Sequence, residues 1–147
     1  MINKRSKIFV AGHNGLVGSA IVRKLISKGY NNIYVVDKKE VDLINQEQVF
    51  KYIKKIKPAF IFLAAAKVGG ILANQKFKAE FIYNNLSIQN NIIHAAYCNG
   101  VKDLIFLLKQ NKSEKKIQKN YHSAHKYYKA LNNYNLCHIE NYKPRTF

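Results

Sequence analysis

Residues 12–18 read Gly-His-Asn-Gly-Leu-Val-Gly, a Gly-x-x-Gly-x-x-Gly pattern between a short apolar run and an amphipathic segment. Over 15–28, apolar residues recur at the spacing of one helical face. In a strand–turn–helix context, Gly12 allows a tight turn, Gly15 lets the backbone approach a pyrophosphate, and Gly18 lets the helix pack closely on its strand. The stretch therefore predicts a dinucleotide-binding turn with phosphates at the helix N-terminus, against the alternative of a glycine-rich turn without a ligand.

Outward from this turn, strand-like and helix-like segments alternate through the first 107 residues. Strands are expected at 7–11, 32–37, 59–64 and 103–107, and helices at 15–28, around 49–56 and at about 79–98. Such alternation predicts a parallel sheet covered on both faces, with right-handed crossovers. We therefore expect an α/β fold of the Rossmann type, a doubly wound sheet with about four strands in the order 3-2-1-4.

Composition narrows the class of protein. A length of 147 residues suits one domain, and the formal net charge of +17 raises the question of nucleic-acid binding. The lysines are spread over the whole chain and no nucleic-acid-binding motif accompanies them, so we do not expect nucleic-acid binding to be the main function. No apolar run is long enough to span a bilayer, and Cys98 and Cys137 make no disulfide framework. We expect a cytoplasmic protein without a membrane partner.

Charged residues after the second strand bear on the choice of cofactor. Asp37 stands where an acid would hydrogen-bond the adenosine ribose hydroxyls of NAD. Lys38 and Lys39 follow directly and would instead hold the 2′-phosphate of NADP. Asp42 and Leu43 are placed to border the adenine, with a simple helix-entry turn as the alternative. The alternative for Asp37, Lys38 and Lys39 is that they are solvated loop charges, and this stretch leaves NAD and NADP both open.

Four segments carry a family signature: 11–21 (AGHNGLVGSAI), 64–71 (AAAKVGGI), 81–85 (FIYNN) and 91–96 (NIIHAA). Together they closely resemble the GDP-L-fucose synthase family, a branch of the extended short-chain dehydrogenase/reductases. The resemblance runs from about Lys7 to Leu107, and the AAAKVGGI segment is its distinctive part. It implies a nucleotide-sugar enzyme that epimerises GDP-4-keto-6-deoxy-D-mannose at C3 and C5 and then reduces C4 with NADPH, giving GDP-L-fucose.

The resemblance also assigns residues. It places the glycine turn on the pyrophosphate, Ala64–Ala66 beside the cofactor ribose, and Lys67 and Gly69 in the loop that faces cofactor and substrate, with Asn85 organising the site. Relatives often have Arg where this chain has Asn14, which weakens the case for NADP, the expected cofactor, over NAD. The candidate cofactor-binding residues are Gly12, Asn14, Gly15, Leu16, Val17, Gly18, Asp37, Lys38, Asp42, Leu43, Ala64, Ala65, Ala66 and Lys67.

The chain departs from the family after the fourth strand. There the family continues Gly-Ser-Ser-Cys-Ile-Tyr-Pro and later supplies Tyr-x-x-x-Lys, whereas this chain continues with 108–112 (LKQNK) and no tyrosine of 109–147 has Lys four residues on. We expect a cofactor-binding half-domain, 1–108, and a divergent basic tail, 109–147, helical or disordered and frameshift-derived. The chain would then be a truncated oxidoreductase/epimerase, inactive alone, with no catalytic residues of its own. The alternatives are a non-catalytic dinucleotide-binding or interaction module and, less favoured, a basic nucleic-acid-binding protein.

Predictions also follow for the histidines and cysteines and for the edge of the sheet. His122, His125, Cys137 and His138 have the side chains of a zinc site but no Cys-x-x-Cys pair, so no metal is expected. His94 and Cys98 lie one helical turn apart and are expected to be packed rather than catalytic. The outer edge of the fourth strand is expected to be bare, favouring self-association into homo-oligomers, unless the tail folds back over it.

Overall fold

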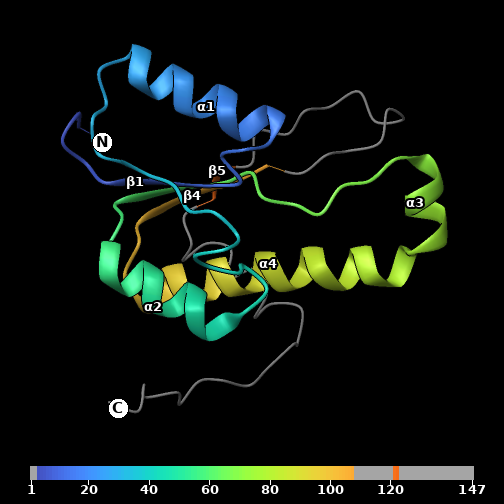
Figure 1. Ribbon diagram of the computed structural model, residues 1–147. Helices are drawn as coiled ribbons and strands as arrows, with labels where there is room; N and C mark the ends of the chain where they lie inside the picture. The colour runs from blue at the N-terminus through green and yellow to red at the C-terminus, as the bar shows by residue number, and fades with distance from the viewer. Residues whose placement is uncertain (1–2, 108–120, 123–147) are drawn as a thin grey trace.

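The computed structural model describes residues 3–107 and 121–122, which form a sheet with helices on both faces (Figure 1). Helix α1 (Leu16–Ser27) lies on one face, and α2 (Gln46–Ile56) and α4 (Lys78–Cys98) lie on the other. A short helix, α3 (Ile71–Lys76), precedes α4 and projects beyond the sheet. The strands are β1 (Ile8–Ala11), β2 (Ile33–Tyr34), β3 (Phe60–Leu63), β4 (Asp103–Phe106) and β5 (Tyr121–His122). The predicted doubly wound Rossmann-type α/β fold is confirmed.

The strand order is β2-β1-β3-β4-β5, with β1 to β4 parallel, and this corrects the expected order 3-2-1-4. The reason is the placement of α2 on the same face as α4, opposite α1. Right-handed crossovers then require the steps from β1 to β2 and from β2 to β3 to run in opposite directions across the sheet, so β3 lands on the far side of β1. Burial agrees, because all four β1 residues are fully buried while the two of β2 are half-buried, as befits an edge.

The sheet also has a fifth strand. Of the segment beyond residue 108, Tyr121 and His122 pair antiparallel with Ile105 and Leu104 of β4. The outer edge of β4 is therefore partly covered, as expected if the tail folds back. The rest of the predicted tail, and with it three of the four residues considered for zinc, lies outside the described residues.

Two apolar layers hold the helices on the sheet. Ile8, Val10 and Phe60 face α1 and pack against its half-buried apolar residues. The larger layer lies on the other face, between the sheet and helices α2 and α4. Its buried members include Phe9, Ile61, Leu63, Val49, Ile53, Ile92, Ala95 and Ala96. Alternate residues of β1 thus point into opposite layers, which is why a continuous apolar run forms the central strand.

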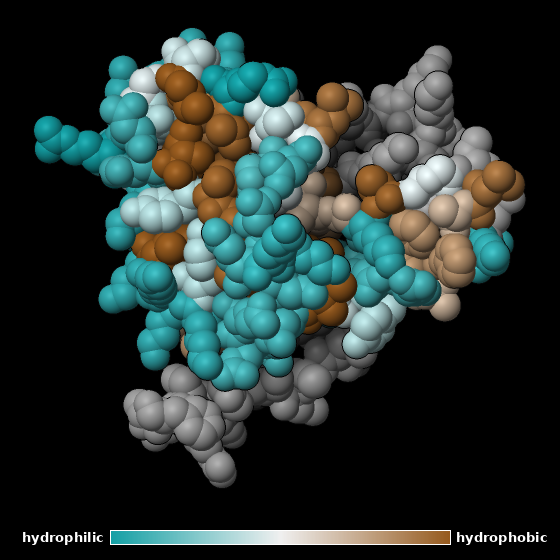
Figure 2. All heavy atoms as spheres, viewed as in Figure 1, coloured by the Kyte–Doolittle hydropathy of each residue, from teal (hydrophilic) through white to brown (hydrophobic). Residues whose placement is uncertain are grey.

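Several boundaries differ from expectation in ways that matter for the site. The expected strand 32–37 pairs with β1 only at Ile33 and Tyr34, and the chain then leaves the sheet, carrying Asp37 into a loop. Helix α3, between the expected third strand and the expected long helix, was not among the predicted helices. Figure 2 shows hydrophilic side chains over α2 and apolar ones at the α3 end, where Leu72 is 82% exposed. Within the described part of the chain, no helix is both long and apolar enough to cross a membrane.

Candidate cofactor-binding site

A pocket of about 400 Å³ opens at the carboxyl ends of β1 and β3. At this point the chain leaves β1 for α1 on one face of the sheet and leaves β3 for α3 and α4 on the other (Figure 1). This is the topological switch point, where open α/β sheets bind their ligands. Its walls come from the glycine turn, the 36–44 loop, residues 64–67 and the middle of α4.

The glycine turn is built by the absence of side chains. Gly12 has φ of +86°, and a Cβ placed on it would lie 2.6 Å from the Ala65 backbone, so β1 and the chain after β3 approach closely here. A Cβ on Gly18 would lie 2.0 Å from the Gly12 carbonyl oxygen. Gly15 lines the pocket and is the N-cap of α1, and no side chain caps the N–H groups of the first turn of this helix.

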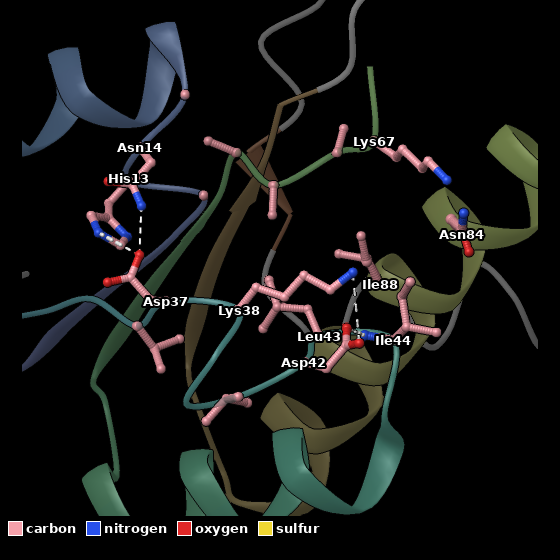
Figure 3. A pocket seen from close by; sticks show the side chains of 17 residues that line it. His13, Asn14, Asp37, Lys38, Asp42, Leu43, Ile44, Lys67, Asn84 and Ile88 are labelled. Carbon is pink, nitrogen blue, oxygen red and sulfur yellow. Dashed lines mark hydrogen bonds and ion pairs between the residues drawn. The ribbon is translucent and has the colours of Figure 1, made fainter. Parts of the chain in front are cut away.

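The β2 side of the pocket carries a hydrogen-bonded acid. Asn14 Nδ2 donates to Asp37 Oδ1 at 2.6 Å, and His13 Nε2 lies 3.8 Å from the same oxygen. Figure 3 shows the three side chains gathered at one end of the pocket. His13 Nδ1 is buried and has no hydrogen-bond partner among the described residues. The glycine turn is thus tied by side chains to the loop after β2.

The loop that follows is held in place by hydrogen bonds. Asp42 Oδ1 accepts from the Ile44 amide at 3.0 Å, and Asn91 Nδ2 of α4 donates to the carbonyls of Leu43 and Ile44 at 3.0 and 2.8 Å. Lys38 runs across the pocket, and its Nζ lies 3.9 Å from Asp42 Oδ2 (Figure 3). The buried Asn91 therefore fixes the backbone at Leu43 and Ile44. Of this loop, Asp42 and Leu43 were the residues predicted to border the adenine.

The opposite wall follows β3 and is held by side chains of α4. Asn85 Oδ1 accepts from the Lys67 amide at 2.6 Å, and Asn85 Nδ2 donates to the Lys67 carbonyl at 3.0 Å. Lys67 Nζ pairs with Glu80 and lies 5.5 Å from the centre of the Phe81 ring. The hydrogen bond from Lys67, together with its positive charge, holds the pKa of Glu80 below the ordinary value.

Most of the candidate residues meet at this pocket. Leu16, Val17 and Gly18 do not line it; Leu16 is 88% exposed, and Gly18 is buried against Gly12. The candidates that do line it are Gly12, Asn14, Gly15, Asp37, Lys38, Asp42, Leu43, Ala64, Ala65, Ala66 and Lys67. The lining residues that sequence reasoning missed are His13, Val36, Val41, Ile44, Asn84 and Ile88. His13 lies inside the quoted motif, so the sequence contained a signal for it. Asn84 and Ile88 lie one helical turn apart on α4, and this spacing alone does not point to the pocket.

The other side-chain groups offer less. No group of three or more potential metal ligands occurs among the residues that the structure describes. Cys98 Sγ lies 3.5 Å from His94 Nε2 on α4, and burial raises the pKa of the Cys98 thiol, which argues against a reactive thiolate.

A parallel sheet, a glycine turn at its first strand and a pocket at the switch point define a Rossmann-type domain. The chain belongs to the NAD dependent epimerase/dehydratase family, whose sequence pattern matches residues 8–137.

The relatives are nucleotide-sugar enzymes. The chain is 54% identical over 107 residues to putative GDP-L-fucose synthase 2 of Arabidopsis thaliana, covering 73% of this chain and 33% of the relative. It is 43% identical to GDP-L-fucose synthase of Escherichia coli over 70% of this chain and 32% of that protein. It thus spans about a third of the length of the curated relatives that it matches. Among solved structures it resembles a GDP-mannoheptose C4 reductase from Campylobacter jejuni with NADP bound, with TM-score 0.70 and 38% identity, covering 83% of this chain and 42% of that one.

Proposed function

We propose that the pocket binds NADP(H) and that the chain is the cofactor-binding part of a GDP-sugar epimerase/reductase like GDP-L-fucose synthase. The observation that carries the proposal is the close approach of Gly12 to Ala65 at the switch point, which leaves no room for a Cβ and brings two backbone segments to one cavity. An uncapped helix N-terminus opens beside it. These features fit a pyrophosphate, and NADP is bound by the similar Campylobacter jejuni reductase.

The residues of this chain would share the work of holding the cofactor. Backbone N–H groups of the first turn of α1, after Gly15, would bind the pyrophosphate, because the Gly15 N–H itself donates to the Gly12 carbonyl oxygen. The small side chains of Ala64–Ala66 would leave space for the nicotinamide ribose. Leu43 and Ile44, anchored by Asn91, would form the apolar wall beside the adenine. When bound, the cofactor supplies the hydride for reduction of a keto sugar.

The proposed substrate class follows from the relatives, which act on GDP-linked sugars by name. Reduction of a ketone also needs an acid to protonate the developing alkoxide. Residues 109–147 contain no Tyr-x-x-x-Lys. We therefore expect the residues of this chain to bind cofactor without turning over GDP-4-keto-6-deoxy-D-mannose. Turnover by the purified chain would contradict this part of the proposal.

Thermal unfolding of the purified chain with and without NADPH and NADH tests the proposal. A ligand that binds the folded state at 100 times its Kd stabilises it by about 2.7 kcal/mol, so the melting temperature should rise. Unchanged melting temperatures with both cofactors at millimolar concentration would overturn cofactor binding.

A Gly15→Ala variant tests whether the cofactor that raises the melting temperature binds at the glycine turn. Gly15 has φ of −76°, which alanine adopts, and the added Cβ would lie 3.3 Å from the Gly12 carbonyl oxygen. The chain should therefore fold while the methyl group blocks the pyrophosphate, abolishing most of the thermal shift. Gly70→Ala is the matched control, because Gly70 has φ of −64° and nothing within 4 Å of an added Cβ. Equal thermal shifts in the two variants would show that the glycine turn does not hold the cofactor.

A further inference from the structure

The fold brings together, at one end of the sheet, lysines that are scattered along the sequence. The parallel strands β1 to β4 all begin at this end, and α1, α2 and α4 all end there (Figure 1). Lys7 and Lys102 directly precede β1 and β4, and Lys28 and Lys57 are the C-caps of α1 and α2. Lys4 Nζ lies beside the turn that follows α1. These five lysines form a surface, named the basic end, at the opposite end of the sheet from the cofactor pocket.

The basic end is exposed, and little negative charge offsets it. All five lysines are exposed, and more basic residues occupy the last turns of α1 and α2. None of the five makes an ion pair with another residue that the structure describes. Among the described acidic residues, Asp103 stands at this end, whereas the others lie between residues 37 and 47 or in the first turn of α4, toward the pocket. An unpaired positive surface is thus left at the end where the strands begin.

Folding alone does not account for this accumulation of charge. Lysines at helix C-termini interact favourably with the helix dipole, which accounts for Lys28 and Lys57. Lys7 and Lys102 precede strands, and sheets have only small net dipoles, so these two charges gain no such interaction. Neighbouring strands lie about 4.8 Å apart and β3 separates β1 from β4, so the backbones of Lys7 and Lys102 lie about 10 Å apart. Like charges gathered in this way destabilise the folded chain, and they favour a ligand of opposite charge.

The side chains around the basic end indicate which ligand it fits. Most of the large exposed apolar side chains lie at the other end, and those described near the basic end are Ile26 and Tyr97. A protein partner or a membrane would meet an apolar patch, since the cores of protein interfaces are apolar and poor in lysine, and membrane-surface helices bury an apolar face. A nucleic-acid backbone needs closely spaced cations and no apolar contact. The basic end therefore fits a chain of phosphates.

We propose that the basic end binds the phosphate backbone of a nucleic-acid duplex without sequence preference. Contact through phosphates alone needs no base-reading motif, and the sequence contains none that we identify. The proposal goes beyond cofactor binding and does not depend on it, because the two surfaces lie at opposite ends of the parallel strands. A duplex and a cofactor therefore bind the same chain at once.

Fluorescence anisotropy of a labelled DNA duplex of about 20 base pairs, titrated with the full chain at about 50 and 200 mM salt, tests the proposal. About four phosphate contacts would give a slope of about −3.6 in log K against log salt, so binding should weaken about 10²-fold over this range. A variant with Lys4→Gln, Lys28→Gln and Lys102→Gln removes one cation from each of three segments of the basic end. It should reduce the slope by about 2.7 and raise the dissociation constant at least about tenfold at the lower salt concentration.

A variant with Lys51→Gln, Lys76→Gln and Lys78→Gln is the matched control. These lysines are exposed, belong to α2, α3 and α4, and lie outside both the basic end and the pocket lining. The control removes the same net charge and should keep the wild-type slope and a dissociation constant within about twofold of the wild-type value. Both variants should unfold in urea close to the wild-type midpoint, because all six substituted side chains are exposed.

Three results would overturn the inference. These are equal effects of the two variants, no salt-dependent binding of the duplex by the wild type, and tighter binding to vesicles that contain phosphatidylserine than to the duplex. The last result would assign the basic end to a membrane surface. The rise in melting temperature with NADPH should persist in both variants, because the pocket is untouched. A wild-type chain that binds the duplex but neither cofactor would overturn the proposed function and leave this inference standing.

Discussion

The two backbone walls of the pocket are built in opposite ways. The wall after β1 depends on missing side chains, since Gly12 and Gly18 have no room for even a methyl group. The wall after β3 depends on side chains that reach it from α4, above all Asn85, which binds both the amide and the carbonyl of Lys67. One wall is held by packing against the sheet and the other by hydrogen bonds at a partly exposed surface.

The difference teaches which changes each wall tolerates. Backbone atoms in close contact cannot rotate aside as a side chain can, so an added methyl group must displace β1 or α1 as a whole. A hydrogen-bonded loop can lose a partner and exchange it for water at modest cost, because the groups involved are accessible. We therefore expect substitutions in the first wall to affect folding and those in the second to affect local order.

Gly18→Ala should have the largest effect. Its Cβ would lie 2.0 Å from the Gly12 carbonyl oxygen and 2.7 Å from the Gly12 carbonyl carbon. We expect a loss of about 3 kcal/mol in the free energy of unfolding, or no cooperative unfolding transition at all, measured in urea. Gly70→Ala, which meets nothing within 4 Å, should unfold close to the wild type. A Gly18→Ala variant with the wild-type midpoint would show that the first wall yields as easily as the second.

Asn85→Ala should have an intermediate and more local effect. It removes the hydrogen bonds of 2.6 and 3.0 Å to Lys67, so we expect a loss of about 1–2 kcal/mol and faster amide hydrogen exchange at Lys67. Asn90→Ala, at an exposed position of the same helix, is the matched control and should leave that exchange unchanged. Equal exchange rates in the two variants would mean that α4 does not hold this wall.

The sequence predicted the local elements of the fold but not the contacts between distant segments. Buried strands and amphipathic helices can be recognised from composition and from the spacing of apolar residues. The bounds of β1, β3, β4, α1 and α4 were therefore predicted to within a residue or two. The strand order was wrong because periodicity does not say which face a helix covers. That choice depends on α2 packing beside α4, a contact between segments that are distant in the sequence.

The parts of the site that the sequence did not predict were missed for a similar reason. The glycine turn is a local motif, and it was predicted from the spacing of its residues. The hydrogen bond between Asn14 and Asp37 joins residues of different loops, and it exists because β2 is short and releases Asp37 toward the turn. Asn84 and Ile88 line the pocket only because α4 crosses below it, which no spacing in the sequence reveals.

The smallest expected effect concerns pH and the second wall. The pKa of Glu80 is lowered chiefly by its hydrogen bond from Lys67, so the folded chain keeps this carboxyl ionised more readily than the unfolded chain does. The stabilisation is therefore present above the unfolded value of 4.5 and is lost as the pH falls through the lower folded value. Relative to Glu80→Gln, the wild type should lose about 1 °C more in melting temperature between pH 6 and pH 3.

Glu47→Gln is the control for Glu80→Gln, because it removes an exposed ion pair that lies away from the site. Glu47 pairs with Lys51 on α2, away from the pocket, and its pKa is lowered by the same kind of hydrogen bond. Both variants should flatten the pH dependence of the melting temperature. Only Glu80→Gln should also weaken the binding of NADPH, with a dissociation constant about twofold higher at pH 7, because Lys67 lines the pocket and loses its partner on α4. If Glu47→Gln weakens NADPH binding equally, the Lys67–Glu80 pair affects the cofactor only through its charge and does not hold this wall in position.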